Sequence, residues 1–289
     1  MVNLIHLCEL MTLRYHDVSS IRVPIETLTK FAERNNFRIV RKMSRGKNRI
    51  KLIRKQIPIC FISGSDSPEF RFMDIADIHI GNPTFDEKLL RSKLQYAVDN
   101  DIKLVFIAGD IFEGVSSENE DAHFCEQLGT AFNIFKDYPL TYHAINGNHD
   151  YSFEQIDLPN PIKTLASRLN AKGIDFNFHD CYLMDFVISG VIKRVMHVER
   201  ADYNLKRVFS ILKLRHFEYE GNCYNTYNNE ILPIRFFEVG HIHMNIQIYY
   251  AKRKVFISHP GSFIRDYSDE DDCCNVITGR VIDQRVFIT

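Results

Sequence analysis

The chain has 289 residues, 45% of them hydrophobic, and a formal net charge of −1, which suffices for one large domain with a real core and a small second domain. No run of 18 apolar residues occurs, and the start, Met1 to His6, lacks a basic region and a cleavage site, so we expect neither a membrane span nor a signal peptide. The seven cysteines are odd in number and form no Cys-x-x-Cys pair, which argues against a disulfide framework or a zinc ribbon and indicates a reducing, cytoplasmic location.

The near-zero net charge hides an asymmetry between the two ends of the chain. Residues 1–65 hold 13 Lys and Arg against 4 Asp and Glu, a net charge of +9, and the remaining residues hold 23 against 33, a net charge of −10. A basic head on an acidic body predicts an anionic partner for the head.

The basic head has the pattern of two helices and a hairpin. Apolar spacing predicts helices over residues 3–15 and 25–35, and two strands over residues 37–41 and 49–54 flank a turn at Gly46. This arrangement resembles a winged-helix DNA-binding module, in which the wing would contact phosphates. The predicted nucleic-acid-binding residues are Arg38, Arg41, Lys42, Arg45, Lys47, Arg49, Lys51 and Arg54. The alternative is a basic surface hairpin that only packs on the main domain.

The Gly-Ser-Asp-Ser-Pro stretch at residues 64–68 predicts the domain boundary, with the head over residues 1–66 and the main domain over residues 67–289. Within the main domain, apolar periodicity predicts helices over residues 85–100, 120–135 and 162–169. Strands are predicted over residues 181–195 and 280–288. Helices that return to strands indicate a sheet with parallel neighbours.

Several apolar strands of the main domain end in Asp, Asn or His. Asp77-Ile78-His79 follows residues 72–76, Gly109-Asp110 follows residues 104–108, and Gly147-Asn148-His149-Asp150 follows residues 142–145. Residues 208–214 run into His216, and residues 235–239 run into Gly240-His241-Ile242-His243. Open α/β sheets place their ligand sites at the carboxyl ends of strands, so these side chains are expected to meet at one site.

The order Asp-x-His, Gly-Asp, Gly-Asn-His-Asp, His, Gly-His-x-His resembles the calcineurin-like metallophosphoesterase superfamily, from about Phe70 to about Gly279. This resemblance implies an α/β sandwich of two packed mixed β-sheets flanked by helices. It also implies two divalent metal ions, most commonly Mn²⁺, with Fe or Zn²⁺ as alternatives.

By the same resemblance, Asp77, His79 and His243 bind the first metal, Asp110 bridges both, and Asn148, His216 and His241 bind the second. His216 is preferred over His197 because an apolar strand leads directly into it, whereas His197 lies nearer a charged stretch. His149 is expected to contact the scissile phosphate and assist the leaving oxygen. Asp150 would orient His149, as a carboxylate orients an imidazole.

The motifs are most similar to those of SbcD-type nucleases, which implies Mn²⁺-dependent exonuclease and endonuclease activity on DNA. That type works with an SMC-like ATPase, but no capping domain or partner-binding helices follow the last predicted strand here. We therefore expect a compact, stand-alone nuclease whose basic head grips DNA. The alternatives are a small-molecule or cyclic-nucleotide phosphodiesterase, a protein phosphatase, and a DNA-binding protein that uses the fold only as a scaffold.

Overall fold

The computed structural model describes residues 16–17, 24–34, 37–44, 47–54, 57–62, 69–115, 120–197, 224–227, 230–241, 243, 245–250, 255–264, 277–282 and 285–288. The chain divides into two compact units, Met1–Pro58 and Ile59–Thr289. The division precedes the boundary expected from the Gly-Ser stretch, because strand β4 (Ile59–Phe61) pairs with a strand of the larger unit.

The first sheet of the larger unit contains six strands in the order β16-β15-β5-β6-β7-β8. Four neighbours, β5 to β8, run parallel, and β15 and β16 add antiparallel strands beside β5. The bounds are β5 (Glu69–Ile75), β6 (Leu104–Ile107), β7 (Thr141–Ile145), β8 (Phe176–His179), β15 (Ile277–Ile282) and β16 (Arg285–Ile288). The single terminal strand predicted from the sequence is therefore two strands that pair with each other.

The second sheet has the order β13-β14-β12-β10-β9-β4, with β11 paired to β12. Strands β10, β12 and β14 run parallel to one another. The bounds are β9 (Leu183–Ile188), β10 (Val191–His197), β11 (Tyr224–Tyr227), β12 (Glu230–Gly240), β13 (Asn245–Tyr250) and β14 (Val255–Pro260).

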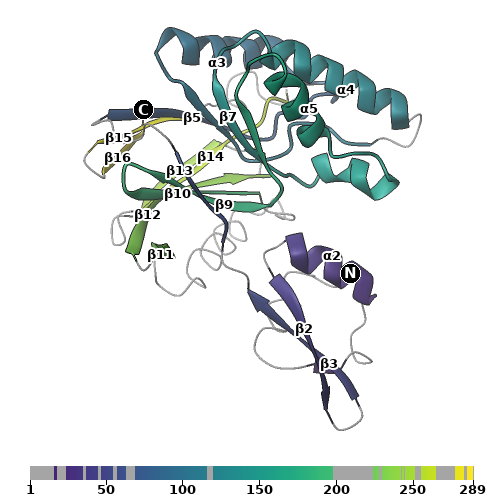
Figure 1. The fold of residues 1–289 in the computed structure, drawn as a ribbon. Coiled ribbons are helices and arrows are strands. Elements are labelled where there is room, and N and C mark those ends of the chain that lie inside the picture. The colour runs from purple at the N-terminus through teal and green to yellow at the C-terminus, as the bar shows by residue number, and fades with distance from the viewer. Residues whose placement is uncertain are drawn as a thin grey trace. The chain divides into compact units, whose positions relative to one another are not determined.

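Helices α3 (Glu87–Asp99), α4 (Glu120–Phe135) and α5 (Pro161–Asn170) lie together on one side of the first sheet, and the second sheet lies on the other (Figure 1). Helix α3 begins where the Asp86 side chain accepts a hydrogen bond from the Leu89 backbone N–H at 3.0 Å, which satisfies one of the free amides of the first turn. Helix α5 begins in the same way at Asn160, followed by Pro161, whose fixed φ suits the first helical position.

The central strands of the first sheet are buried on both faces, and alternate residues serve different layers. Val105 and Ile107 of β6 pack with the helices, whereas Leu104 and Phe106 pack between the two sheets. Successive side chains of a strand point to opposite faces of its sheet. Here helices cover one face and the second sheet covers the other, so both sets are buried. This burial explains why these strands read as continuous apolar runs.

A charged side chain lies inside the layer between the sheets. The ammonium group of Lys193, 2% exposed, lies 2.8 Å from carboxylate oxygens of Asp74 and Glu238 and 4.0 Å from the ring centroid of Phe236. Burial raises the pKa of both carboxylic acids, and Lys193 opposes that rise. A buried charge is tolerated only when it is paired in this way.

The smaller unit contains helix α2 (Ile25–Arg34) and a sheet of three strands in the order β1-β3-β2. Strands β2 (Phe37–Ser44) and β3 (Lys47–Arg54) form an antiparallel pair, and β1 (His16–Asp17) adds to β3. The predicted second helix and hairpin are present, whereas the predicted first helix, residues 3–15, lies outside the described residues. The resemblance to a winged helix therefore stays a prediction.

The α/β architecture with two packed sheets and flanking helices agrees with the fold expected from the sequence. In the part of the chain that the structure describes, no helix is long and apolar enough to cross a membrane.

Candidate metal centre

Parallel strands from both sheets bring the predicted site together. Asp77 and His79 follow β5, Asp110 follows β6, and Asn148 follows β7. From the second sheet, His197 is the last residue of β10, and His241 and His243 follow its parallel neighbour β12. Carboxyl ends of parallel strands meet at one edge. We call these seven residues, together with His149, the strand-end site.

The backbone at the strand-end site is strained. Five of its residues have φ in the left-handed region, namely Asp77 (51°), His79 (54°), Asp110 (52°), His241 (94°) and His243 (55°). A non-glycine residue in a sparsely populated backbone region costs on the order of 1–3 kcal/mol and persists only where the surroundings hold it. Here backbone N–H groups of Asp77 and His79 donate to the carbonyls of Gly109 and Asp110 at 3.2 and 3.0 Å.

The first group of side chains is Asp77, His79 and His243, whose candidate ligand atoms lie within 4.8 Å of one another. The Nε2 atoms of His79 and His243 are 3.0 Å apart. The other ring nitrogen of His79, Nδ1, lies 2.8 Å from Oε2 of Glu113. A carboxylate at Nδ1 holds the proton there and leaves the Nε2 lone pair available to a metal.

The second group is Asp110, His197 and His241, again within 4.8 Å, with Asn148 between them. The amide oxygen Oδ1 of Asn148 lies 3.0 Å from Nε2 of His197 and 2.8 Å from Nδ1 of His241. Nδ1 of His197 donates to the Ala108 carbonyl at 2.7 Å, which leaves its Nε2 lone pair facing Asn148 and Asp110.

Asp110 lies between the two groups and is fully buried. Its Oδ1 accepts a hydrogen bond from the backbone N–H of His149 at 2.8 Å. Its Oδ2 lies 3.2 Å from Nε2 of His197 and 3.9 Å from Nε2 of His79. A fully buried carboxylate oxygen between imidazoles of both groups is placed as a bridging metal ligand would be.

The electrostatics of the cluster also fit cations. Burial opposes a charge on His197, but the carboxylates of Asp110 and Asp77 outweigh burial and raise its pKa to about 9. Burial raises the pKa of Asp77 well above its usual range. The same carboxylates that favour a proton on His197 would favour a metal ion in its place. Mixed imidazole, carboxylate and amide donors suit Mn²⁺, Fe or Zn²⁺.

His149 lies beside both groups, and with His79 and Asp110 it forms a further set of candidate ligand atoms within 4.8 Å of one another. Its ring packs edge-to-face on His79 with centroids 4.7 Å apart, and its Nδ1–H donates to the Glu113 carbonyl at 2.6 Å. Asp150 does not orient His149 as the sequence suggested. Its carboxylate accepts hydrogen bonds from the backbone N–H groups of Asp110, Phe112 and Gly147 at 2.8 to 2.9 Å, and so fixes the loops that follow β6 and β7. Its side chain is fully buried and lies beneath the site.

Two glycines of the motifs are required by close approach. A Cβ on Gly147 would collide with the Asp110 carboxylate, and one on Gly240 would collide with the Ala108 carbonyl and the His197 ring. The Gly-Asn-His-Asp and Gly-His-x-His motifs therefore begin with glycine because only a bare backbone fits beside these ligands.

The structure brings together six of the seven predicted metal ligands, and the seventh, His216, lies outside the described residues. His197 lies in the second group with Asp110 and His241. An apolar strand leads into His197 as well, and that signal pointed to it. Glu113 was not singled out, although Gly109-Asp110 lies just before it. His259 is buried nearby with neither ring nitrogen hydrogen-bonded, and burial together with His197 lowers its pKa to about 3.

The eight basic residues predicted to bind nucleic acid belong to the smaller unit and form no part of the strand-end site's own unit. Strand β2 carries Arg38, Arg41 and Lys42, and β3 carries Lys47, Arg49, Lys51 and Arg54, while Arg45 lies outside the described residues. Arg41 is exposed, and Lys42 pairs across the strands with Arg49.

Comparison with known proteins identifies a family and a set of similar folds. The sequence model described as calcineurin-like phosphoesterase matches residues 70–245. No curated protein matches the chain. Similar solved structures include GAP50, the anchor in the inner membrane complex of Plasmodium, at 10% identity and a TM-score of 0.42, covering 76% of this chain and 83% of that chain. Vps29 from Entamoeba histolytica, as a single mutant and as the wild type complexed with Zn²⁺, matches at 12% identity and a TM-score of 0.35, covering 76% of this chain and 97% of that one.

Proposed function

Because the chain belongs to the calcineurin-like phosphoesterases, we propose that it is a phosphodiesterase with two divalent metal ions and that its substrate is DNA. The observation that carries the proposal is the position of Asp110, whose fully buried Oδ2 lies between the imidazoles of His79 and His197. A carboxylate in that position is suited to two cations at once.

The proposed ligands follow from the two groups. Asp77, His79 and His243 would hold one metal, Asn148, His197 and His241 would hold the other, and Asp110 lies where it could bind either. Such a pair, of which Mn²⁺ is our first choice, polarises phosphate oxygens and lowers the pKa of water. Glu113 keeps His79 in the tautomer that binds.

His149 is the proposed catalytic residue of the chain. The Glu113 carbonyl accepts a hydrogen bond from Nδ1–H of His149, which fixes the ring. The imidazolium form, with a second proton on Nε2, would give that proton to the leaving oxygen and return to the neutral Nδ1–H tautomer. The backbone N–H of His149 donates a hydrogen bond to Oδ1 of Asp110 and so fixes His149 beside the proposed metal ligands. A proton supplied from a fixed group near the reacting bond is typically worth about 10²–10⁴-fold in rate.

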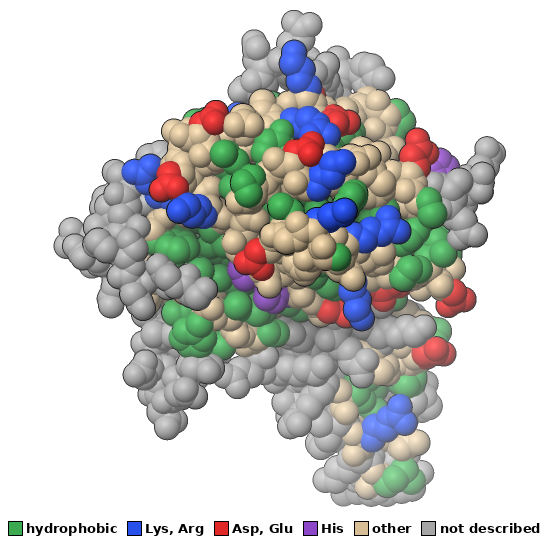
Figure 2. Space-filling model, turned by 45° about the horizontal axis from the view of Figure 1, so that its top comes forward, with side chains coloured by type: hydrophobic (Ala, Val, Ile, Leu, Met, Phe, Trp, Pro, Cys, Tyr) green, Lys and Arg blue, Asp and Glu red, His purple; other side chains and the backbone are tan. Residues whose placement is uncertain are grey.

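The choice of DNA rests on charge and on the motifs shared with SbcD-type nucleases. Residues 1–65 carry a net charge of +9, whereas the rest of the chain carries −10. On the face of the larger unit in Figure 2, basic and acidic side chains are interspersed and form no single basic patch. Strands β2 and β3 carry seven of the eight predicted basic residues, and Lys42 and Arg49 are register partners in that hairpin. The basic hairpin is thus the part of the chain suited to phosphates.

The test uses purified protein with Mn²⁺ on labelled single-stranded and double-stranded DNA, beside bis-p-nitrophenyl phosphate and cyclic nucleotides. Binding to duplex DNA should weaken with salt with a log–log slope of about −0.9 per phosphate contact. Replacing Arg45, Lys47 and Arg49 by Ala should flatten that slope by up to about 3 units and reduce DNA cleavage, without changing hydrolysis of bis-p-nitrophenyl phosphate.

The matched control replaces three exposed lysines of the larger unit, Lys88, Lys103 and Lys172, by Ala and should keep the wild-type slope. If the hairpin variant cuts DNA as well as the wild type across the salt titration, the hairpin does not deliver DNA. The small-molecule phosphodiesterase is then the better proposal. Hydrolysis of phosphorylated peptides alone would favour a protein phosphatase, and no hydrolysis of any substrate would favour a scaffold.

A further inference from the structure

A second cluster of metal-binding side chain types lies in the larger unit. Cys60 of β4, His143 of β7 and His179 of β8 have candidate ligand atoms within 4.8 Å of one another. We call these three residues the inter-sheet cluster, because β4 belongs to the second sheet and β7 and β8 belong to the first. None of the three belongs to the strand-end site.

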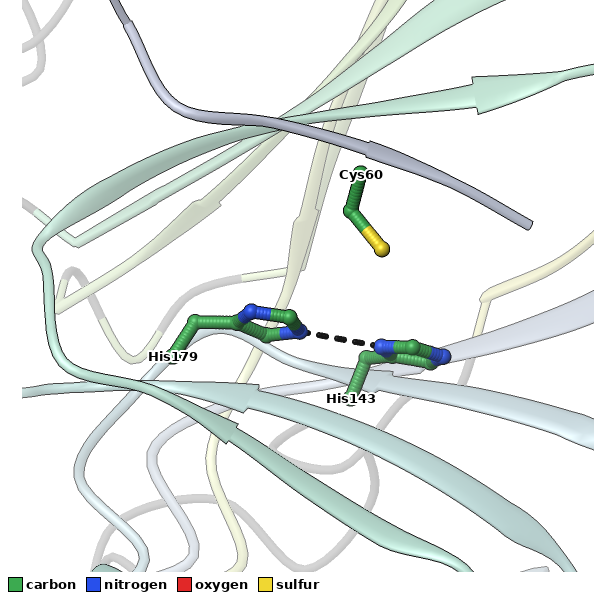
Figure 3. A group of neighbouring side chains, drawn as sticks. All are labelled: Cys60, His143 and His179. Atoms are coloured by element: carbon green, nitrogen blue, oxygen red, sulfur yellow. Dashed lines mark hydrogen bonds between the residues drawn. The ribbon is translucent and has the colours of Figure 1, made fainter.

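The three side chains converge on one point. His143 and His179 come from neighbouring parallel strands, and their ring planes differ by only 9°. Nδ1 of His143 and Nε2 of His179 face each other at 3.0 Å, and the Cys60 thiol points toward the gap between them from the opposite sheet (Figure 3). Two nitrogens and one sulfur are thus directed to a common centre from three separate strands.

We infer that the inter-sheet cluster is a Zn²⁺ site, with the Cys60 thiolate and the two imidazoles as protein ligands and water as the fourth. Tetrahedral Zn²⁺ takes nitrogen ligands at about 2.0–2.1 Å and sulfur at about 2.3 Å, which places two nitrogens roughly 3.3 Å apart. The observed 3.0 Å therefore requires the rings to separate by only a few tenths of an ångström. Sulfur and imidazole without a carboxylate favour Zn²⁺ over Mn²⁺ or Mg²⁺.

The competing explanation is a hydrogen bond between two neutral histidines in an apolar layer. The rings are flanked by Phe186, whose centroid lies 5.3 Å from that of His143 and 5.2 Å from that of His179. Burial lowers the pKa of each imidazole to about 4, so both are neutral at pH 7, as ligands must be. The Cys60 thiol donates a long hydrogen bond to the Phe61 carbonyl at 3.9 Å, and burial raises its pKa, so metal binding would have to displace its proton. Its sulfur lies within 4.8 Å of a ring nitrogen of each histidine, and a simple pair of histidines does not require this third candidate ligand.

The position of the cluster indicates what the metal would do. Strands β4 and β8 are the last strands of their sheets in the described order, so one ion would join the edges of the two sheets. His143 is 8% exposed, whereas Cys60 and His179 are partly exposed, which gives the metal a route from solvent. The proposed role is structural, since His149 and the proposed metals of the hydrolysis reaction belong to the strand-end site.

The test is cobalt substitution of the full-length protein. Co²⁺ bound by a thiolate gives a near-ultraviolet charge-transfer band, which the carboxylate, imidazole and amide ligands of the strand-end site cannot produce. Metal-free wild-type protein titrated with Co²⁺ to three equivalents per chain, enough for the two strand-end metals and the inter-sheet cluster, should gain this band with the amplitude of one thiolate-bound Co²⁺ per chain, and added Zn²⁺ should remove it. Cys60→Ser should lose the band, whereas Cys125→Ser, which changes an exposed thiol, should keep it.

His179→Gln provides a second variant in case Cys60→Ser does not fold. The Co²⁺ dissociation constant determined from the charge-transfer band should rise at least tenfold in this variant. Its hydrolysis of bis-p-nitrophenyl phosphate should match that of the wild type. Zn²⁺ at about 100 times its dissociation constant should raise the unfolding temperature of the wild type by about 5–10 °C more than that of His179→Gln. A wild type without the band, a band that persists in Cys60→Ser, or equal zinc stabilisation of both proteins would each overturn the inference.

Discussion

The strand-end site and the inter-sheet cluster both gather histidines, but they are built on different backbone. The strand-end residues Asp77, His79, Asp110, His241 and His243 all have positive φ, beyond the ends of regular strands. Cys60, His143 and His179 lie within the bounds of β4, β7 and β8. The first site contains carboxylates that raise the pKa of His197 to about 9, whereas burial lowers that of His143 to about 4.

This difference separates two ways of holding a cation. At the strand ends, hydrogen bonds between loops hold a strained backbone. The buried carboxylates among these side chains attract cations. Between the sheets, the ligands of the inter-sheet cluster are neutral imidazoles and a thiol on regular strands, and the packing of the two sheets fixes their spacing. The first arrangement suits catalysis and the second suits structure.

The largest expected effect comes from Asp110→Ala, which removes the carboxylate common to both metal groups. Turnover of bis-p-nitrophenyl phosphate should fall on the order of 10³-fold or more, because several kcal/mol of charge stabilisation are lost. Elemental analysis should show loss of both strand-end metals. The cobalt–thiolate band should remain, so that a variant without the band would show that the two sites are not independent.

His149→Ala should lower turnover by about 10²–10⁴-fold while both strand-end metals stay bound, because all seven proposed ligands are unchanged in this variant. Steady-state kinetics and metal content on the same preparation check this. His123→Ala, on helix α4, is the control and should stay within about twofold of the wild type. Loss of metal from His149→Ala would make His149 a ligand instead.

A pair of variants distinguishes the two candidates for the second metal. His197→Ala should lower metal affinity and turnover by about 10²-fold, since ligand support alone is typically worth 10–100-fold. His216→Ala should have little effect, because His197 already lies 3.0 Å from the Asn148 amide oxygen and 3.2 Å from Asp110. The reverse result would restore His216 as the ligand.

The smallest effect is expected for Glu113→Gln, which keeps the shape but removes the charge beside Nδ1 of His79. Metal affinity should fall by about 10–100-fold, so activity should recover when excess Mn²⁺ is added. Glu87→Gln, at an exposed position of α3, is the control. Activity that does not recover with metal would assign Glu113 a role beyond positioning His79.

Local patterns predicted the elements that position the strand-end site. Continuous apolar runs gave β5, β6 and β7, because strands that are buried on both faces have no polar alternation. The motif residues at their ends followed from the rule that ligand sites form at carboxyl ends. The helix over residues 85–100 is present as α3, two residues shorter at its start because the Asp86 side chain caps it.

The sequence by itself determined the family pattern, the strand ends and most of the side chains that gather there, because these depend on residue type and on periods of two and 3.6 residues. Only the tertiary structure places His197 beside Asn148 and Asp110, since β10 and β12 become parallel neighbours through pairing between distant segments. It also decided that Asp150 binds backbone amides rather than His149. The inter-sheet cluster, too, could be found only from the tertiary structure. Cys60, His143 and His179 share no motif, and they meet only because two sheets pack face to face and place three strands around one point.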